Sequence, residues 1–205
     1  MLSQNAAFFQ YGKTETEALK NADPILGAAM HKLGRVERPA NPDLFQALSQ
    51  AVVGQLISVK AAQSIWERML RRFGRIDPAV IAAESPEELR ACGLTEKKAA
   101  SIHRIASSIR TGEFNLNELV QLPDAEVVRR LTALPGIGVW TAEMVLLHAM
   151  QRPDVVSWGG VAIRRGMMKL YGLDGLSKQQ FDEYRRRYSP YGSVASIYLW
   201  EISYG

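Results

Sequence analysis

The residues best suited to bind a ligand form one short run, Leu134-Pro-Gly-Ile-Gly-Val-Trp-Thr-Ala142. Gly136 and Gly138 permit positive φ and let another backbone approach closely. Gly138 also stands where the amides of a following helix are free, and those amides together with the helix dipole favour an anion such as a phosphate. Apolar Ile137 would attach the run to the body of the protein. The alternative is a helix connection that binds nothing, which a bare Gly-x-Gly favours, but the full spacing reverses that preference.

Metal and disulfide chemistry is disfavoured. The single cysteine, Cys92, cannot build a disulfide framework, an iron–sulfur cluster or a thiolate zinc site. His31, His103 and His148 show no metal-ligand spacing. The sequence therefore predicts a site without a divalent metal, in a protein kept in a reducing compartment.

Composition excludes several protein classes but does not identify a partner. The 205 residues suffice for one core or two small lobes, and a hydrophobic content of 47% excludes disorder. No run approaches the roughly 18 apolar residues of a membrane span, and the N-terminus does not resemble a secretory signal. We therefore expect a cytoplasmic or nucleoid protein with no membrane partner. The net charge of +4 permits nucleic-acid binding, but enzymes acting on small anions look the same.

Apolar residues recur at the helical period through most of the chain, which predicts an all-α fold with nine or ten helices. Ser85 and Ser177 stand at the start of capping patterns, and 152–160 is a loop without periodicity. The expected helices cover 42–54, 57–74, 85–93, 97–109, 124–131, 140–148, 163–170, 177–184 and 193–200. Alternating strand patterns are absent beyond short ambiguous runs such as 154–157.

These features together resemble the helix-hairpin-helix DNA glycosylases, and within them the 3-methyladenine (alkylated purine) DNA glycosylase II branch. The resemblance runs from about Phe9 to the C-terminus. It rests on six patches in the same order, 9–12, 54–62, 89–94, 134–142, 152–157 and 191–200. It implies a single all-α unit of two lobes with DNA in the cleft between them. Lobe A would cover about 40–150, including the hairpin at 134–142, and lobe B 1–39 with 151–205.

The resemblance also implies an activity. It points to a monomeric, monofunctional enzyme of base excision repair that binds double-stranded DNA, flips out an alkylated purine and hydrolyses its glycosidic bond. Leu56 would fill the gap left by the flipped base, although an ordinary core leucine is the other reading. The expected DNA-binding residues are Gln55, Leu56, Ser58 and Lys60 in one segment and Gly136, Ile137, Gly138, Val139 and Thr141 in the hairpin.

An aromatic pocket is expected for the base. Relatives that also cut the DNA backbone carry a lysine two residues after the second hairpin glycine, where this chain has Trp140, so Schiff-base chemistry is disfavoured. Electron-rich rings attract a positively charged alkylated base by about 0.5–2 kcal/mol. The pocket candidates are Trp140, Trp200, Trp158, Tyr11 and Phe9, with plain core packing as the alternative.

No organic cofactor is expected. In relatives, main-chain carbonyls of the hairpin hold a monovalent cation that bridges to a phosphate oxygen. The resemblance places those carbonyls here on Thr132, Leu134 and Ile137, with Na⁺ or K⁺ as the ion.

One position departs from the family pattern. Relatives read approximately D-V-x-S-W-G-D-L-A-I-R-R-G, and 154–166 matches on both sides without a gap, so Gly160 occupies the position of the family's catalytic aspartate. A glycine cannot stabilise an oxocarbenium-like transition state or orient water. Asp154 and Glu143 are remote substitutes that we expect to be structural. The chain is then an impaired or inactivated glycosylase, an otherwise active one carrying an introduced substitution, or a damaged-DNA-binding protein without catalysis.

Overall fold

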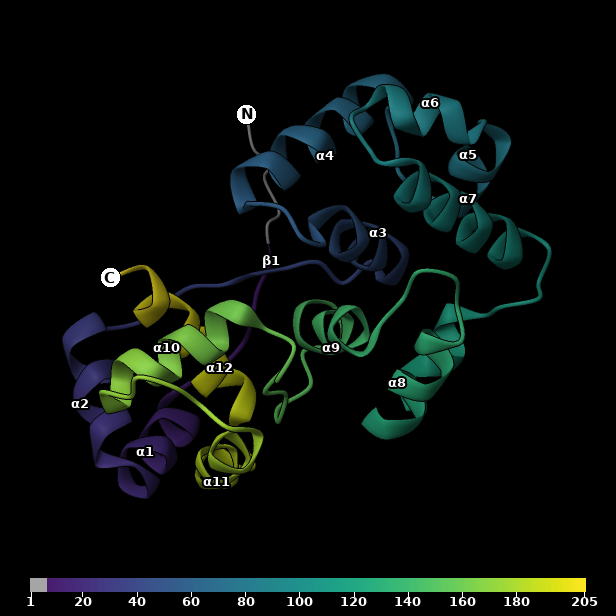
Figure 1. The fold of residues 1–205 in the computed structure, drawn as a ribbon. Helices are drawn as coiled ribbons and strands as arrows, with labels where there is room; N and C mark the ends of the chain where they lie inside the picture. Colours follow the sequence, from purple (N-terminus) through teal and green to yellow (C-terminus); the bar gives the residue numbers. More distant parts are fainter. Residues whose placement is uncertain (1–6) are drawn as a thin grey trace. The chain divides into compact units, whose positions relative to one another are not determined.

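The computed structural model describes residues 7–205, and the regular secondary structure of this part of the chain is almost entirely helical (Figure 1). It contains twelve α-helices, one 3-10 helix and two strands of two residues each. The predicted all-α class is confirmed. The chain divides into two compact units, one formed by Asn41–Val145 and the other by Leu146–Gly205 with the described residues up to Ala40. No helix in the described part is long and apolar enough to span a membrane.

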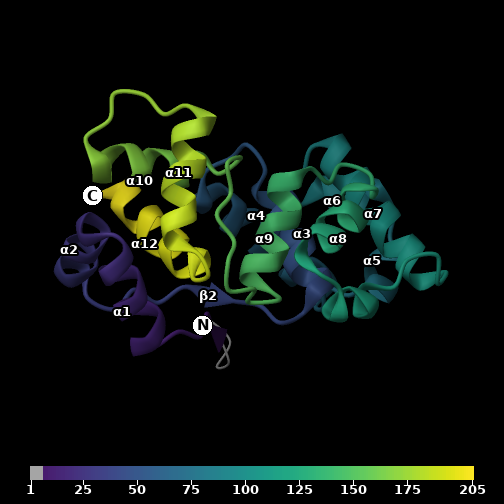
Figure 2. The ribbon, with the colours of Figure 1, turned by 90° about the horizontal axis from the view of Figure 1, so that it is seen from below.

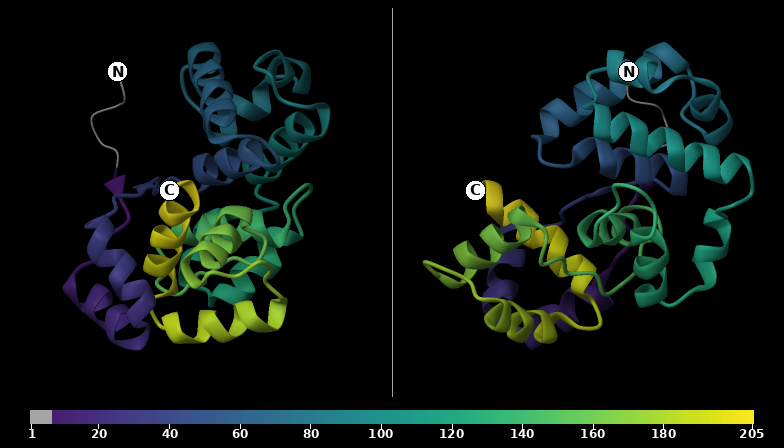
Figure 3. Two further views of the ribbon diagram at one scale, coloured as in Figure 1. Left: turned by 60° about the vertical axis from the view of Figure 1, so that its left-hand side comes forward. Right: turned by 45° about the vertical axis from the view of Figure 1, so that its right-hand side comes forward.

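The unit at 41–145 is built around α7 (Glu96–Arg110), which packs against α3, α5 and α6 (Figure 3). Its other elements are α3 (Leu44–Gly54), α4 (Val59–Phe73), α5 (Pro78–Ala83), α6 (Pro86–Ala91), η1 (Leu116–Gln121) and α8 (Asp124–Thr132). Five of these helices begin with a side chain that accepts a first-turn amide, the preferred way to satisfy the free donors of a helix N-terminus. The capping residues are Asp43, Ser58, Asp77, Ser85 and Thr95.

The other unit is centred on α12 (Gly192–Tyr204), whose residues 192–199 are all buried. Figure 2 shows α12 with α1 and α2 on one side and α10 and α11 on the other, and α12 packs against all four. These helices are α1 (Lys13–Ala22), α2 (Pro24–Leu33), α10 (Val161–Tyr171) and α11 (Lys178–Tyr188). A Cβ at Gly166 would collide with the Leu199 carbonyl, so this glycine sets the close approach of α10 to α12.

Two short strands, β1 (Ala7–Phe8) and β2 (Pro39–Ala40), pair antiparallel in this second unit. α9 (Val139–His148) crosses from one unit to the other. All nine expected helices are present, but α1, α2 and α5 were not expected. Two of these three carried a readable signal, because Asp23-Pro24 and Asp77-Pro78 each place a capping aspartate before a proline at the first helical position.

Candidate nucleic-acid interface and active site

The run between α8 and α9 is a tight helical hairpin that requires glycine at one position. Gly136 has φ +77°, and a Cβ there would lie 2.6 Å from the Ser101 Oγ. The Ser101 hydroxyl donates to the Pro135 carbonyl, and buried Ile137 attaches the hairpin to its unit as expected. Of the two glycines that permit positive φ, only Gly136 uses it; Gly138 has no positive φ, and a Cβ there would meet nothing within 4 Å.

The hairpin presents the start of α9 to solvent. Gly138 is exposed, Val139 is 56% exposed, and Trp140 is half-buried in the first turn. The first four amides of an α-helix have no acceptor within the helix. Exposed donors at the positive end of the helix dipole can therefore bind an anion at this edge.

The turn between α3 and α4 carries a leucine in an unfavourable conformation. Leu56 has φ +57°, and its side chain is fully exposed. The left-handed region costs a leucine about 1–2 kcal/mol. Ile57 and Val59, which follow, are also exposed. Leu56 is therefore not a core residue, which removes the alternative left open from the sequence.

Gln55 bonds this turn to the hairpin. Its Nε2 donates to the Gly136 carbonyl at 3.1 Å and to the Thr141 Oγ1 at 2.9 Å. Thr141 is 2% exposed. The Thr141 hydroxyl accepts from Gln55 inside the protein, and its contact with a ligand stays a prediction. Gln55 and Thr141 hold two loops of one unit together.

Two further residues of the predicted DNA-binding set lie at the start of α4. The Ser58 hydroxyl accepts from the Ala61 amide at 3.2 Å and caps the helix, which accounts for its position without a ligand. Lys60 is exposed in the first turn. Of the two, only Lys60 carries a charge available to a phosphate.

Gly160, in the other unit, is the N-cap residue of α10. Its φ of −76° and ψ of 101° are open to any amino acid, and no side chain caps this helix. Its amide donates to the Ser157 carbonyl at 3.2 Å, and its carbonyl accepts from the Arg164 amide at 3.0 Å. A Cβ at buried Gly160 would lie 3.0 Å from the Ile163 Cγ1 and 3.3 Å from the Ser157 carbonyl oxygen, both closer than an ordinary contact. An aspartate at 160 therefore requires these neighbours to shift by a few tenths of an ångström, and its carboxylate would then lie at the start of α10.

Asp154 has a structural role. Its carboxylate accepts from the Gly192 amide at 3.1 Å and from the Ser189 hydroxyl, which fixes the start of α12 to the loop. A Cβ at Gly192 would collide with the Asp154 Oδ1. This supports the expectation that Asp154 shapes the loop and does not replace a carboxylate at 160. Glu143 is half-buried on α9.

Trp200 already carries a cation on its ring. The Arg38 guanidinium carbon lies 3.1 Å from the ring centroid, and the His148 ring meets Trp200 edge-on at 6.2 Å. The indole Nε1 donates to the Tyr204 hydroxyl at 2.8 Å. Burial lowers the pKa of Arg38 to about 10, and burial together with the Arg38 charge lowers the pKa of His148 to about 4. One face of the predicted pocket residue is thus covered by a side chain of the protein itself.

The remaining aromatic candidates differ in placement. Trp158 is half-buried and packs edge-on against Phe181 at 5.1 Å, with the Arg164 guanidinium 4.9 Å from its ring. Tyr11 and Phe9 are buried, and the Tyr11 hydroxyl bonds to the main chain. The structure thus places Tyr11 and Phe9 in the core of their unit, the alternative noted for them above.

Metal ligands do not gather in the described part of the chain, where no group of three or more His, Cys, Asp or Glu side chains could hold an ion. Main-chain carbonyls are the oxygen donors that hard cations prefer. In the hairpin the Leu134 carbonyl accepts a long bond of 3.3 Å from the Ile137 amide. A carbonyl oxygen has two lone pairs, so this one keeps a site for a monovalent ion.

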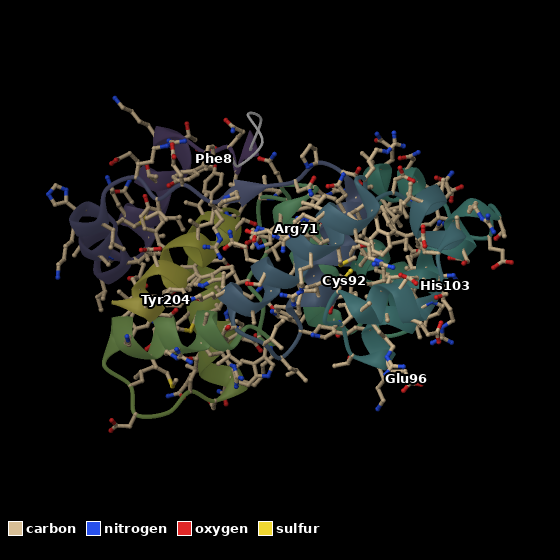
Figure 4. All side chains as sticks on the ribbon, turned by 90° about the horizontal axis from the view of Figure 1, so that it is seen from above. Phe8, Arg71, Cys92, Glu96, His103 and Tyr204 are labelled. Atoms are coloured by element: carbon tan, nitrogen blue, oxygen red, sulfur yellow. The ribbon has the colours of Figure 1, made fainter. Side chains whose placement is uncertain are left out.

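An open cavity of about 380 Å³ is lined by Arg68, Arg71, Arg72, Ala91 and Cys92. Figure 4 labels two of these residues, Arg71 and Cys92. The Arg68 Nε donates to the Cys92 carbonyl at 2.7 Å, and Arg72 pairs with Glu88. Burial raises the pKa of the Cys92 thiol, which keeps it protonated. Two of the three arginines serve the fold, so this cluster is largely a satisfied surface.

The family follows from comparison with known proteins. Residues 50–190 match the model of the HhH-GPD superfamily base excision DNA repair proteins. The chain belongs to the HhH-GPD superfamily. A DNA-3-methyladenine glycosylase 1 of Schizosaccharomyces pombe is 31% identical to this HhH-GPD protein over 164 residues, covering 78% of this chain and 72% of the relative. The chain spans 72%, 66%, 58% and 65% of the lengths of four curated relatives.

Two solved HhH-GPD structures share the fold. A DNA-3-methyladenine glycosidase from Bacillus halodurans superposes with a TM-score of 0.81 at 32% identity, covering 96% of this chain and 92% of that one. A 3-methyladenine DNA glycosylase of Schizosaccharomyces pombe, solved in complex with abasic DNA, has a TM-score of 0.84 at 28% identity, covering 92% and 96%. The resemblance read from the motifs is confirmed.

Sequence reasoning missed three residues of these sites in the HhH-GPD chain. Ser101 supports the hairpin, Lys98 binds carbonyls next to Leu56, and Arg38 covers Trp200. Each acts on a residue more than thirty positions away, so no local spacing marks it. Of these three residues, only Lys98 could have been noticed in the sequence, because it is a basic residue on an otherwise apolar helix face.

Proposed function

We propose that this protein binds double-stranded DNA containing a damaged base and descends from monofunctional N-glycosylases that hydrolyse alkylated purines in base excision repair. The observation that carries the proposal is Leu56, an exposed leucine held at positive φ in a turn that Gln55 bonds to the hairpin. Strain of this kind persists where the surroundings fix it, and it concentrates at functional sites. The abasic-DNA complex of the yeast relative supports DNA as the ligand.

Two loops contribute to DNA binding, the hairpin before α9 and the turn between α3 and α4. The exposed amides at the start of α9 donate to a backbone phosphate, with Lys60 as a second cationic contact. Leu56 enters the base stack and occupies the space of the flipped nucleotide, at the cost of unstacking one step. A base extruded in this way becomes accessible to water. A half-buried tryptophan beside the hairpin, Trp140, is a stacking surface for it.

The chemical step is where this chain departs from an efficient hydrolase. Cleavage breaks the bond between the sugar carbon and the base nitrogen, the base leaves with the electron pair, and water adds to the oxocarbenium-like sugar. A carboxylate at 160 would stabilise that cation and accept the proton of the water. Gly160 has no such group, so base release depends on the weakened bond of an alkylated purine.

A second function rests on the same glycine. A protein that flips and holds a damaged base without a carboxylate at 160 is a damaged-DNA-binding protein. It would mark or shield the lesion instead of removing it. A chain that keeps the Leu56 turn and the hairpin but carries a glycine at 160 favours this reading.

Restoring the carboxylate tests the proposal. Base release from alkylated duplex DNA is measured for the unaltered chain, Gly160→Asp and the uncharged control Gly160→Asn, together with affinity for a duplex carrying an abasic analogue. We expect Gly160→Asp to release base on the order of 10²–10³ times faster, with Gly160→Asn unchanged. Tight, lesion-selective binding by the unaltered chain without release supports the binding protein. Absence of lesion selectivity in every variant overturns both functions.

We further propose that the carbonyls of Thr132, Leu134 and Ile137 hold Na⁺ or K⁺ when DNA is bound, and that the protein acts as an intracellular monomer. The lone pair left on the Leu134 carbonyl supports the ion. Replacing K⁺ by a bulky organic cation at equal ionic strength should weaken DNA binding. Equal affinity in both salts would exclude a specific ion.

A further inference from the structure

Lys98 stands out among the basic residues because its charge is directed into the protein. Its Nζ donates to the Val53 carbonyl at 2.8 Å and to the Gln55 carbonyl at 2.7 Å. The side chain comes from α7 and is half-buried, whereas that of the preceding residue, Lys97, is exposed. A single ammonium thus binds the main chain immediately before Leu56.

The turn at Leu56 needs such support. α3 ends at Gly54, and the last carbonyls of a helix have no partner within it and carry its negative partial charge. A glycine just beyond the helix end commonly resolves this by adopting positive φ without cost. Here the positive φ falls on Leu56. The strained conformation is retained because the surrounding structure fixes it from both sides.

The two supports are chemically different. Gln55 ties the turn to the hairpin through its side chain, and Lys98 ties the carbonyls of Val53 and Gln55 to α7. All of these residues belong to one compact unit. Removing Lys98 would leave two partly buried carbonyls at the negative end of α3 without a cation, and the turn could relax toward negative φ.

We propose that Lys98 is a positioning residue for base flipping: it clamps the carbonyls before Leu56 and so holds that side chain ready to enter the DNA stack. The inference rests on the proposed function, in which Leu56 is the residue that enters. Burial lowers the pKa of Lys98, as expected for an ammonium withdrawn from water. The alternative role for a basic residue is a direct contact with a DNA phosphate, which requires the charge to face solvent. The Lys98 ammonium instead donates to two main-chain carbonyls.

A double-mutant cycle separates the two roles. The probe is a duplex with an abasic analogue beside 2-aminopurine, whose fluorescence rises when the neighbouring bases unstack. The variants are Lys98→Met, Leu56→Ala and the pair combined, with Lys97→Met as the matched control on the same helix. Affinity for an undamaged duplex is measured in parallel at two salt concentrations.

We expect Lys98→Met to lower the fluorescence rise at saturating protein by about tenfold, as Leu56→Ala does, and the combined variant to lose no more than Leu56→Ala alone. Lys97→Met should match the unaltered chain. Affinity of Lys98→Met for the undamaged duplex, and its salt dependence, should stay within about twofold. A purely structural role would lower thermal stability without this dependence on Leu56.

Three results overturn the clamp: full unstacking by Lys98→Met, a further loss in the Leu56→Ala background, or weaker binding of undamaged duplex with a reduced salt slope. If Leu56→Ala unstacks the duplex normally, the proposed role of Leu56 fails instead. Should Lys98→Met not fold, Lys98→Gln keeps a donor for one carbonyl and is expected to show the same pattern at smaller size. A fluorescence rise equal to that of the unaltered chain in folded Lys98→Gln also overturns the clamp.

Discussion

Leu56 and Gly160 are opposite exceptions to the same rule. At Leu56 the backbone adopts φ +57°, where glycine is favoured, yet the chain carries a leucine with a fully exposed side chain. At Gly160 the backbone adopts φ −76° at a helix N-cap, where glycine is accepted but aspartate, asparagine and serine cap better. The first substitution adds an apolar side chain at a cost in strain. The second leaves a helix N-cap without a side-chain acceptor.

The contrast separates recognition from chemistry. The exposed leucine contacts nothing in its own unit, and in the proposed function it is the residue that enters the DNA. Gly160 supplies no side chain at the start of α10. Leu56 and Gly160 belong to different compact units, so the proposed roles in binding and in hydrolysis can be tested separately.

The largest effect is expected for Gly136→Ala, which tests whether the Leu56 turn depends on the hairpin to which Gln55 bonds it. Gly136→Ala places a Cβ 2.6 Å from the Ser101 Oγ at a φ of +77°. We expect a loss of about 2–4 kcal/mol in the free energy of unfolding, from overpacking and from the left-handed conformation. Binding of abasic DNA should weaken as well. Chemical denaturation and a titration with labelled duplex measure both.

Gly138→Ala is the matched control for Gly136→Ala, because its Cβ would meet nothing and its φ is ordinary. Its cost in stability should stay within about 1 kcal/mol, since alanine is a poorer N-cap than glycine. Equal losses for the two variants would show that the hairpin does not depend on positive φ at Gly136.

The next effect concerns the unit that carries Gly160, where burial beside Arg38 lowers the pKa of His148 to about 4. In the unfolded chain a histidine titrates near 6.5, so below that pH the unfolded state binds the proton first. Stability contributed by neutral His148 is complete above about pH 6.5 and is lost as the pH falls toward 4. The loss should reach on the order of 3 kcal/mol.

His148→Phe removes this titration and should flatten the acid side of the profile of unfolding free energy against pH. The comparison between the two regions predicts that binding through the Leu56 turn survives mild acid better than the structure around Trp200 does. Tryptophan fluorescence and abasic-DNA affinity, followed together from pH 7 to 4.5, measure the two responses. Coincident loss of both signals would argue against independent regions.

Much of the fold was readable from local signals. The capping box at Ser177 is present, Ser85 caps its helix, and the hairpin lies at the predicted run. Each is encoded within a few residues, because capping and turn formation depend on neighbours in the chain. The assignment of Gly160 to the position of the family's aspartate stays a prediction from the sequence pattern of 154–166.

The support of the Leu56 turn was not readable. Leucine is no signal for positive φ, and the contacts that fix it come from Lys98 and from the hairpin, 43 and 81 residues away from Gln55. The contact between Arg38 and Trp200 is a similar case. The sequence around Arg38 is basic and is typical of an exposed segment, yet the Arg38 guanidinium lies on the ring of Trp200 near the C-terminus. Pairwise packing between distant segments leaves no periodic trace in a single sequence.

A smaller effect tests whether the Leu56 strain is real. Leu56→Gly removes a left-handed leucine whose side chain packs against nothing, and glycine accepts φ +57° without steric cost. We expect the free energy of unfolding to rise by up to about 1 kcal/mol. Relief of the left-handed strain stabilises the folded chain, and the greater conformational freedom that glycine gives the unfolded chain offsets part of that gain. Unstacking of damaged DNA should fall at the same time. Thermal unfolding measures the change in stability, and 2-aminopurine fluorescence measures the unstacking of DNA. A Leu56→Gly variant that is less stable than the unaltered chain would show that Leu56 stabilises the fold.

The smallest effect tests the other half of the comparison, the room for a side chain at 160. Gly160→Asn supplies an acceptor to the uncapped amides of α10, and we expect a gain of a few tenths of a kcal/mol in stability. Gly160→Ala adds the same Cβ without an acceptor and should cost about 0.5–1 kcal/mol, since alanine is a poor N-cap. Thermal unfolding of the pair isolates the cap, because both variants make the 3.0 Å contact with the Ile163 Cγ1. If both lose more than about 1 kcal/mol, that contact does not yield, and position 160 no longer has the space that an aspartate needs.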